Sequence, residues 1–153
     1  MFLLDRLLRW PLTAAHGLLK LSWRLRRPRT FGAHAVALTP ERRIVLVRLR
    51  YAPGWRLPGG GHGPGEDPRD AVLRELREEI GLLSHGAVTM AGELEENIHS
   101  KRDLASLFIV EDVSYRPRWS WEIEAVMEAA PDDLPPDLSP SSADWLAGLR
   151  GFL

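Results

Sequence analysis

Three glutamates lie close together in the segment Gly60–Leu82, and their spacing points to a metal site. The segment reads GGHGPGEDPRDAVLRELREEIGL, a glycine-rich stretch followed by a helix-forming pattern. With roughly 100° of rotation per helical residue, Glu75, Glu78 and Glu79 fall within about 100° of one another. Like charges on one helical face repel, so this face needs a counter-charge. A hard divalent cation with oxygen ligands supplies it, and bound magnesium typically also contacts substrate phosphates.

The same segment carries the start and stop signals of a helix from about Asp67 to Ile80. Asp67 is suited to the N-cap, Pro68 to the first turn and Gly81 to the left-handed position past the end. A separate face of the helix is apolar and should pack against a sheet. Its members are Val72, Leu73, Leu76 and Ile80.

An ordinary solvated helix is the alternative interpretation of this pattern. Arg74 and Arg77 could pair with the glutamates in a ladder along the surface. Such a ladder does not explain why the glycine-dense run WRLPGGGHGPGE stands directly before the helix.

The segment resembles the Nudix box, G-x5-E-x7-R-E-U-x-E-E-x-G-U, where U is an aliphatic residue. Every fixed position is filled at the right spacing, by Gly60, Glu66, Arg74, Glu75, Leu76, Glu78, Glu79, Gly81 and Leu82. Nine specified positions within 23 residues are far more specific than a lone glycine loop. Flanking segments extend the resemblance to about residues 31–150: Gly54–Gly60 before the box, and Trp121–Glu124 and Asp132–Pro135 after it. We therefore predict a Nudix hydrolase domain over residues 31–153.

The resemblance implies a reaction, a cofactor and a set of ligands. The reaction is hydrolysis of the pyrophosphate bond in a nucleoside diphosphate linked to another moiety, by attack of water on phosphorus. The cofactor is Mg²⁺ or Mn²⁺, which would neutralise the phosphate oxygens and lower the pKa of the attacking water. The implied ligands are the Gly59 carbonyl and the carboxylates of Glu75, Glu78 and Glu79. Gly60, Glu66 and Arg74 are expected to support the site.

The box does not fix which carboxylate activates the water. The later candidates are Glu93, Glu95, Glu96, Glu122 and Glu124. We predict a strand over Trp121–Ala129, in which successive side chains point to opposite faces of the sheet. One face then carries Glu122, Glu124, Val126 and Glu128. The other face carries Ile123, Ala125 and Met127. Glu122 lies nearest the start of this strand and is expected to be a metal ligand, the general base, or both, with Glu79 as the alternative base.

Substrate contacts are less specified by the sequence. Arg48, Arg56 and Arg102 are candidates for phosphate binding, because a guanidinium suits bidentate contact with phosphate. Trp55 either packs beneath the glycine run or stacks on a base, and we favour packing. Residues 97–100 lack the proline or tyrosine that would indicate a substrate subclass, so ADP-ribose or a nucleotide sugar is the default substrate.

The rest of the chain predicts a mixed α/β fold, and the resemblance implies an α/β/α sandwich with a mixed sheet. The predicted strands are Phe31–Thr39, Arg43–Arg50, Trp55–Leu57, Val88–Glu95, Leu104–Asp112 and Trp121–Ala129. A polar loop, Glu96–Asp103, should join the fourth and fifth of these strands. A final helix is expected over Ser141–Leu149.

Composition sets outer bounds on function. With 153 residues, 44% hydrophobic and 27% charged, the chain is the size of one soluble domain. It has no cysteine, which excludes disulfides, thiolate zinc sites and cysteine nucleophiles. We expect a cytoplasmic protein acting on a small nucleoside diphosphate, with a homodimer as an open alternative.

Residues 1–30 differ from the rest of the chain. They hold seven Lys or Arg and one acid, for a charge of +6, whereas the remainder carries −7. This leucine-rich stretch has no uncharged run long enough to span a membrane. We predict an amphipathic helical arm, not an independent domain, that packs on its own domain or on a dimer mate. Adsorption to an anionic membrane or contact with RNA through this arm, and a catalytically silent nucleotide-binding module, are the alternative functions.

Overall fold

The fold was determined as a computed structural model, which describes residues 29–63, 65–98 and 101–151. Side chains of residues 29–30, 94–98 and 101–103 are outside this description, as are residues 1–28 of the arm predicted over residues 1–30. The elements follow one another in the order β1 (Arg29–Ala37), β2 (Ile44–Leu49), β3 (Trp55–Arg56), β4 (Gly59–His62), α2 (Pro68–Glu79), β5 (Leu82–Ser84), β6 (Val88–Ile98), β7 (Lys101–Val110), β8 (Ser114–Tyr115), β9 (Ile123–Ala129) and α3 (Pro140–Gly148). Arg29 and Thr30, which we assigned to the arm, are therefore the first residues of β1.

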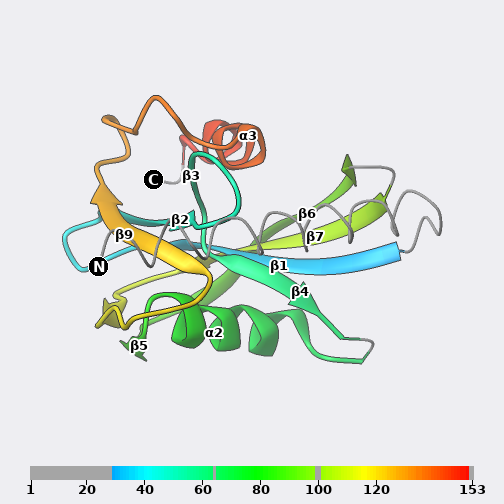
Figure 1. Cartoon of the computed structure of the whole chain (residues 1–153), viewed down its shortest axis with the longest axis horizontal. Helices are drawn as coiled ribbons and strands as arrows, with labels where there is room; N and C mark the ends of the chain where they lie inside the picture. The colour runs from blue at the N-terminus through cyan, green and yellow to red at the C-terminus, as the bar shows by residue number, and fades with distance from the viewer. Residues whose placement is uncertain (1–28, 64, 99–100, 152–153) are drawn as a thin grey trace.

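The strands form a mixed arrangement, as predicted. One sheet has the order β4-β1-β7-β6, a second has the order β3-β2-β9, and β5 pairs with β8. β1 and β7 run parallel, while the other strand pairs are antiparallel. Figure 1 shows α2 on one side of these strands and α3 on the other, which confirms the α/β/α sandwich.

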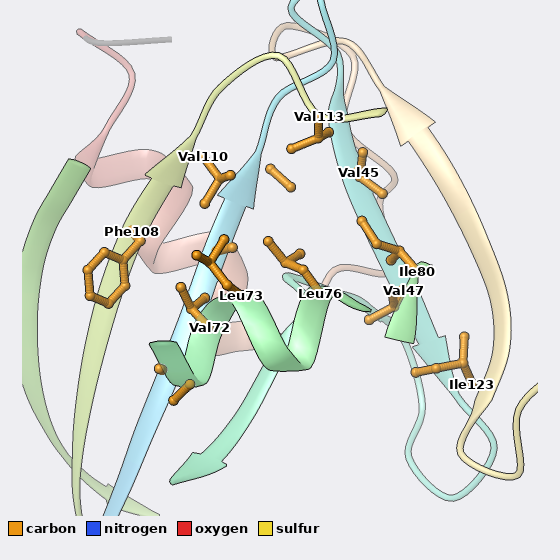
Figure 2. Close-up of a cluster of buried hydrophobic side chains, with 14 of the residues drawn as sticks. Val45, Val47, Val72, Leu73, Leu76, Ile80, Phe108, Val110, Val113 and Ile123 are labelled. Carbon is orange, nitrogen blue, oxygen red and sulfur yellow. The ribbon is translucent and has the colours of Figure 1, made fainter. Parts of the chain in front are cut away.

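The core is divided between the two helices. β1 and β2 alternate, so that Ala35 and Val45 belong to the apolar cluster on the α2 side, whereas Val36 and Leu46 belong to the cluster on the α3 side. Figure 2 shows Leu76 of α2 and the C-cap residue Ile80 among the strand side chains. Both residues are fully buried, as the amphipathic pattern of the helix predicts.

The observed strands differ from the predicted ones. Of the predicted polar loop Glu96–Asp103, residues 96–98 and 101–103 belong instead to β6 and β7, which pair as far as Ile98 opposite Lys101. The glycine run Gly59–His62 is a strand, β4, paired with β1. In both segments the strands pair through main-chain hydrogen bonds, so polar side chains or glycines do not prevent strand formation.

The predicted alternation along Trp121–Ala129 was also wrong at its start. β9 begins at Ile123, and its register against β2 shifts between Arg48 and Leu49. This irregularity places Ile123 and Val126 on the α2 side together, although strict alternation puts them on opposite faces. Glu122 precedes the strand instead of lying within it.

None of the helices within residues 29–63, 65–98 and 101–151 is long and apolar enough to cross a membrane.

The attachment of α2 to the sheets can be tested by truncating Leu76. Leu76→Ala leaves a cavity at a fully buried position and should lower the free energy of unfolding by about 2–5 kcal/mol. Urea titration followed by circular dichroism measures the loss. The matched control is Leu83→Ala, whose side chain is 63% exposed and whose removal should change stability by less than about 0.5 kcal/mol. Equal losses in the two variants would contradict the placement of α2.

Candidate active site

The capping residues of α2 fix where its glutamates stand. The Asp67 side chain accepts a hydrogen bond from the Arg69 N–H at 2.8 Å, and Pro68 occupies the first turn. Gly81, just past the end, has φ of +70°, which favours glycine. The start and stop signals predicted from the sequence are therefore confirmed, and the helix spans the three box glutamates.

Arg74 joins the helix to the segment before it. Its Nε donates to Glu66 Oε1 at 3.0 Å, and its Nη1 donates to Glu75 Oε1 at 2.7 Å. Its Nη2 donates to the Gly61 carbonyl of β4 at 3.1 Å, and Glu78 Oε2 lies 3.5 Å from Nη1. The hydrogen bond from Arg74 lowers the pKa of Glu66, and hydrogen bonds to Glu66 and Glu75 raise the pKa of Arg74. One guanidinium thus contacts three carboxylates and the backbone of β4.

Glu79 turns inward instead of joining this exposed network. Its side chain is buried, with 6% of its surface exposed, and its Oε2 accepts the Gly59 N–H at 2.8 Å. The pKa of Glu79 is raised to about 8, chiefly by burial and also by the nearby carboxylates of Glu75 and Glu122, against the opposing effect of the Gly59 hydrogen bond. The C-terminal turn of α2 therefore presents a desolvated carboxyl group to β4.

The glycines of β4 allow the helix to approach this closely. A Cβ added at Gly60 would lie 2.8 Å from the Glu75 carboxylate. Gly59 has φ of +142°, and a Cβ there would lie 2.3 Å from the Ala33 carbonyl oxygen of β1. A side chain at either position would push β4 away from α2 or from β1.

Glu122 reaches the same carboxylates from a distant part of the chain. It is near enough to Glu75 and Glu79 to raise the pKa of both. The Tyr51 hydroxyl donates a hydrogen bond to Glu122 Oε1, and the Arg50 N–H donates to the Glu122 carbonyl at 2.9 Å. Tyr51 was not predicted to be a site residue. The one signal for it in the sequence is its position directly after the predicted strand Arg43–Arg50.

The three predicted phosphate-binding arginines fall in different places. Arg56 lies beside Glu79 and Tyr51, and burial lowers its pKa; its Nε is buried without a hydrogen-bond partner among the described residues. Arg48 is not brought to the carboxylates, because it pairs with Asp137 at 2.8 Å and stacks over Trp55 on the α3 side. The side chain of Arg102 lies outside the described residues. Trp55 packs against the α3-side cluster, with the Arg48 guanidinium over its ring.

Among the other candidate bases, Glu93 lies away from these carboxylates. It is exposed on β6, the edge strand at the opposite end of the sheet from β4. Glu124 lies at the irregular start of β9, and the side chains of Glu95 and Glu96 are outside the description.

The carboxylates fit a hard divalent cation by their chemistry. Glu75, Glu79 and Glu122 supply oxygen donors within electrostatic reach of one another, and their mutual repulsion favours a bound positive charge. Within residues 29–63, 65–98 and 101–151, however, no three acidic or histidine side chains converge as a formed metal-binding group. Arg74 engages Glu75 Oε1 and Glu78 Oε2, and the Gly59 N–H engages Glu79 Oε2, so a cation would compete with these contacts or bind the second oxygen of each carboxylate.

With this geometry, the chain matches the family model of the NUDIX domain over residues 28–149. The chain belongs to the NUDIX domain family, which confirms the resemblance seen in the sequence.

Solved structures and sequence relatives agree with this assignment. The crystal structure of a MutT NUDIX hydrolase from Burkholderia pseudomallei has a TM-score of 0.68 and 27% identity, and it covers 78% of this chain and 97% of that chain. The RNA pyrophosphohydrolase of Pseudomonas savastanoi pv. phaseolicola is 49% identical over 48 residues, which are 31% of this chain and 30% of that protein. Nudix hydrolase 25 of Arabidopsis thaliana is 48% identical over 41 residues, 27% of this chain and 23% of that protein. The chain thus matches less than a third of the length of these two sequence relatives.

The burial of Glu79 predicts how stability without metal depends on pH. The folded-state pKa of about 8 lies above the ordinary value of 4.5, so the folded state keeps a proton that the unfolded state loses in this interval. The stability from this group is therefore fully present below pH 4.5 and is lost as pH rises through about 8. The amide oxygen of Glu79→Gln can still accept the Gly59 N–H. As pH rises from 5 to 8.5, the free energy of unfolding of this variant should increase relative to that of the parent protein by on the order of a few kcal/mol.

Urea titrations at both pH values in the presence of a chelator measure this difference. Glu78→Gln is the control, because Glu78 is an exposed neighbour on the same turn. A pH profile of Glu79→Gln parallel to that of the parent protein would show that Glu79 is not desolvated.

Proposed function

We propose that this protein is a metal-dependent hydrolase that cleaves the pyrophosphate bond of a nucleoside diphosphate linked to another moiety. The observation that carries the proposal is the electrostatic interaction of Glu75 and Glu79 on α2 with Glu122, which directly precedes β9. Family membership supports the same reaction class, because the relatives named above are Nudix hydrolases and a pyrophosphohydrolase. The default substrates are ADP-ribose and nucleotide sugars.

The metal would be held by Glu75, Glu78, Glu79 and Glu122 together with the Gly59 carbonyl. Mg²⁺ or Mn²⁺, when bound, would supply Lewis-acid stabilisation of the phosphate oxygens and would lower the pKa of a bound water. The repulsion among these carboxylates supports the assignment, because it is relieved by a cation.

Glu122 is the proposed general base. The Tyr51 hydroxyl occupies Oε1, and we assign Oε2 to the attacking water. The water oxygen forms a bond to phosphorus, its proton passes to Glu122, and the bond from phosphorus to the bridging oxygen breaks. Glu79 is the alternative base, because burial raises its pKa to about 8 in the absence of metal and a general base works best with a pKa near the operating pH.

Arg56 is the proposed phosphate contact. Its guanidinium is partly desolvated and lies beside Glu79, which places it at the same end of α2 as the carboxylates. A half-buried guanidinium can form charge-assisted hydrogen bonds to phosphate oxygens through its remaining N–H groups. Arg74 and Glu66 would position the helix and have no proposed contact with the reacting atoms.

Hydrolysis can be tested with a substrate panel in Mg²⁺ or Mn²⁺. The panel comprises ADP-ribose, a nucleotide sugar, a dinucleoside polyphosphate and a 5′-triphosphorylated RNA. The RNA is included because one similar protein is an RNA pyrophosphohydrolase. We expect a nucleoside monophosphate and a phosphorylated remainder from at least one of the first three, with turnover abolished by a chelator. Nucleotide binding without turnover of any compound would instead indicate a silent binding module.

The role of Glu122 can be tested with isosteric variants. Glu122→Gln should lower kcat by about 10²–10⁴-fold, the range for loss of a general base. Tyr51→Phe removes the hydroxyl that orients Glu122 and should lower kcat by roughly 10–100-fold. Glu93→Gln, an exposed glutamate on the edge strand, is the control and should retain full activity. A normal rate for Glu122→Gln with collapse in Glu124→Gln would instead place the base at Glu124 of β9.

A further inference from the structure

Two tryptophans next to the proposed base are left exposed. Trp119 is 62% exposed and Trp121 is 60% exposed, on the segment between β8 and β9. Their ring centroids are 4.6 Å apart with an interplanar angle of 77°, an edge-to-face pair. Large aromatic side chains are highly buried on average, so a pair that folding leaves in solvent calls for another explanation.

The segment that carries the pair is held in place at both ends. At its start, the Arg116 N–H donates to the Gly81 carbonyl, just past α2, at 3.0 Å. Near its end, the Ser120 carbonyl accepts from Arg50 Nε at 3.2 Å, and the Ser120 hydroxyl oxygen accepts from the N–H groups of Glu122 and Ile123 at 3.1 and 3.2 Å. The main chain around both rings is therefore fixed, and the rings are presented without any need to order the loop on binding.

The pair is also adjacent to the proposed chemistry. Trp121 directly precedes Glu122, so their Cα atoms are about 3.8 Å apart. Glu122 in turn bonds Tyr51 and interacts with Glu75 and Glu79. A substrate whose phosphates lie at Glu122 brings its next group close to these rings.

The chemistry of the segment suits a nucleotide. Aromatic faces bind bases by stacking, which is tolerant of base identity because every base has a π-face. Arg116 and Arg118 are exposed on the same segment, so it carries positive charge beside an acidic site and favours the negatively charged part of a ligand.

We propose that Trp119 and Trp121 form the base-stacking site of the substrate, with a nucleobase as the occupant. The inference rests on the proposed function for the position of the phosphates. It assigns recognition of the nucleoside to this segment and predicts little discrimination among bases. Substrates that share a base and differ in the other moiety should therefore depend on the pair equally.

Calorimetric titration of the full-length protein with Mg²⁺ tests this site without turnover. The probes are adenosine monophosphate and ribose 5-phosphate, which differ by the base. Trp119→Ala and Trp121→Ala should each weaken adenosine monophosphate binding by about tenfold or more, the lower part of the range for loss of one stacking contact. Affinity for ribose 5-phosphate should be the same in every variant.

Conservative variants separate stacking from packing. Trp121→Phe keeps an aromatic face and should retain most of the affinity, whereas Trp121→Leu keeps apolar bulk and should bind as weakly as Trp121→Ala. Met90→Ala, at an apolar side chain 47% exposed on β6, is the matched control and should bind like the parent protein. Equal binding by Trp121→Leu and Trp121→Phe would overturn stacking, even if an alanine variant failed to fold.

The remaining outcomes also decide the question. Unchanged adenosine monophosphate affinity in the tryptophan variants, with a change in mass by light scattering, would make the pair a contact between copies of the chain and overturn the proposal. Absence of any nucleotide binding by the parent protein would overturn it as well. If the pair governs nucleotide binding while no panel compound is hydrolysed, the stacking site stands and the proposed hydrolase function fails. Hydrolysis with unaltered binding in the variants would overturn the stacking site and leave the hydrolase function standing.

Discussion

Repulsion between carboxylates is the constraint on which the candidate site depends. Glu75 and Glu79 stand on one helix, and Glu122 interacts with them from the segment before β9, so each ionised group makes the next harder to ionise. Two opposing contacts hold the arrangement: Arg74 on the exposed side and the Gly59 N–H on the buried side. The cost of this crowding is offset by the apolar face of the same helix, where Leu76 and Ile80 are fully buried.

The glycines of β4 make this balance sterically possible. Gly60 lets the Glu75 carboxylate lie against the strand, and Gly59 lets the same strand lie against β1. Because β4 pairs with β1, the position of α2 is tied to the four-stranded sheet and not to a free loop. The acidic helix is thereby held at a fixed distance from β4, whose Gly59 carbonyl is expected to bind the same metal ion.

The segment before β9 joins the proposed chemistry to the proposed recognition. Ser120 and Arg50 hold its main chain, which places Glu122 on the side of the carboxylates while Trp119 and Trp121 stay in solvent. A single anchored stretch thus carries the proposed base and the proposed stacking site. Because both lie on the same backbone, a displacement of this segment would alter binding and turnover together.

The sequence by itself determined the box helix, its caps, its apolar and acidic faces and the family, because each is a local pattern read within one turn or one motif. Tertiary structure decided what approaches that helix. The register of β3 against β2 sets Arg56 beside Glu79 and turns Arg48 to the α3 side, although both arginines looked equivalent in the sequence. The irregular start of β9 moves Glu122 out of the strand, and Tyr51 meets it across 71 residues. Such placements depend on strand register and on bulges, which are fixed by pairing between distant segments and leave no signal at the residues themselves.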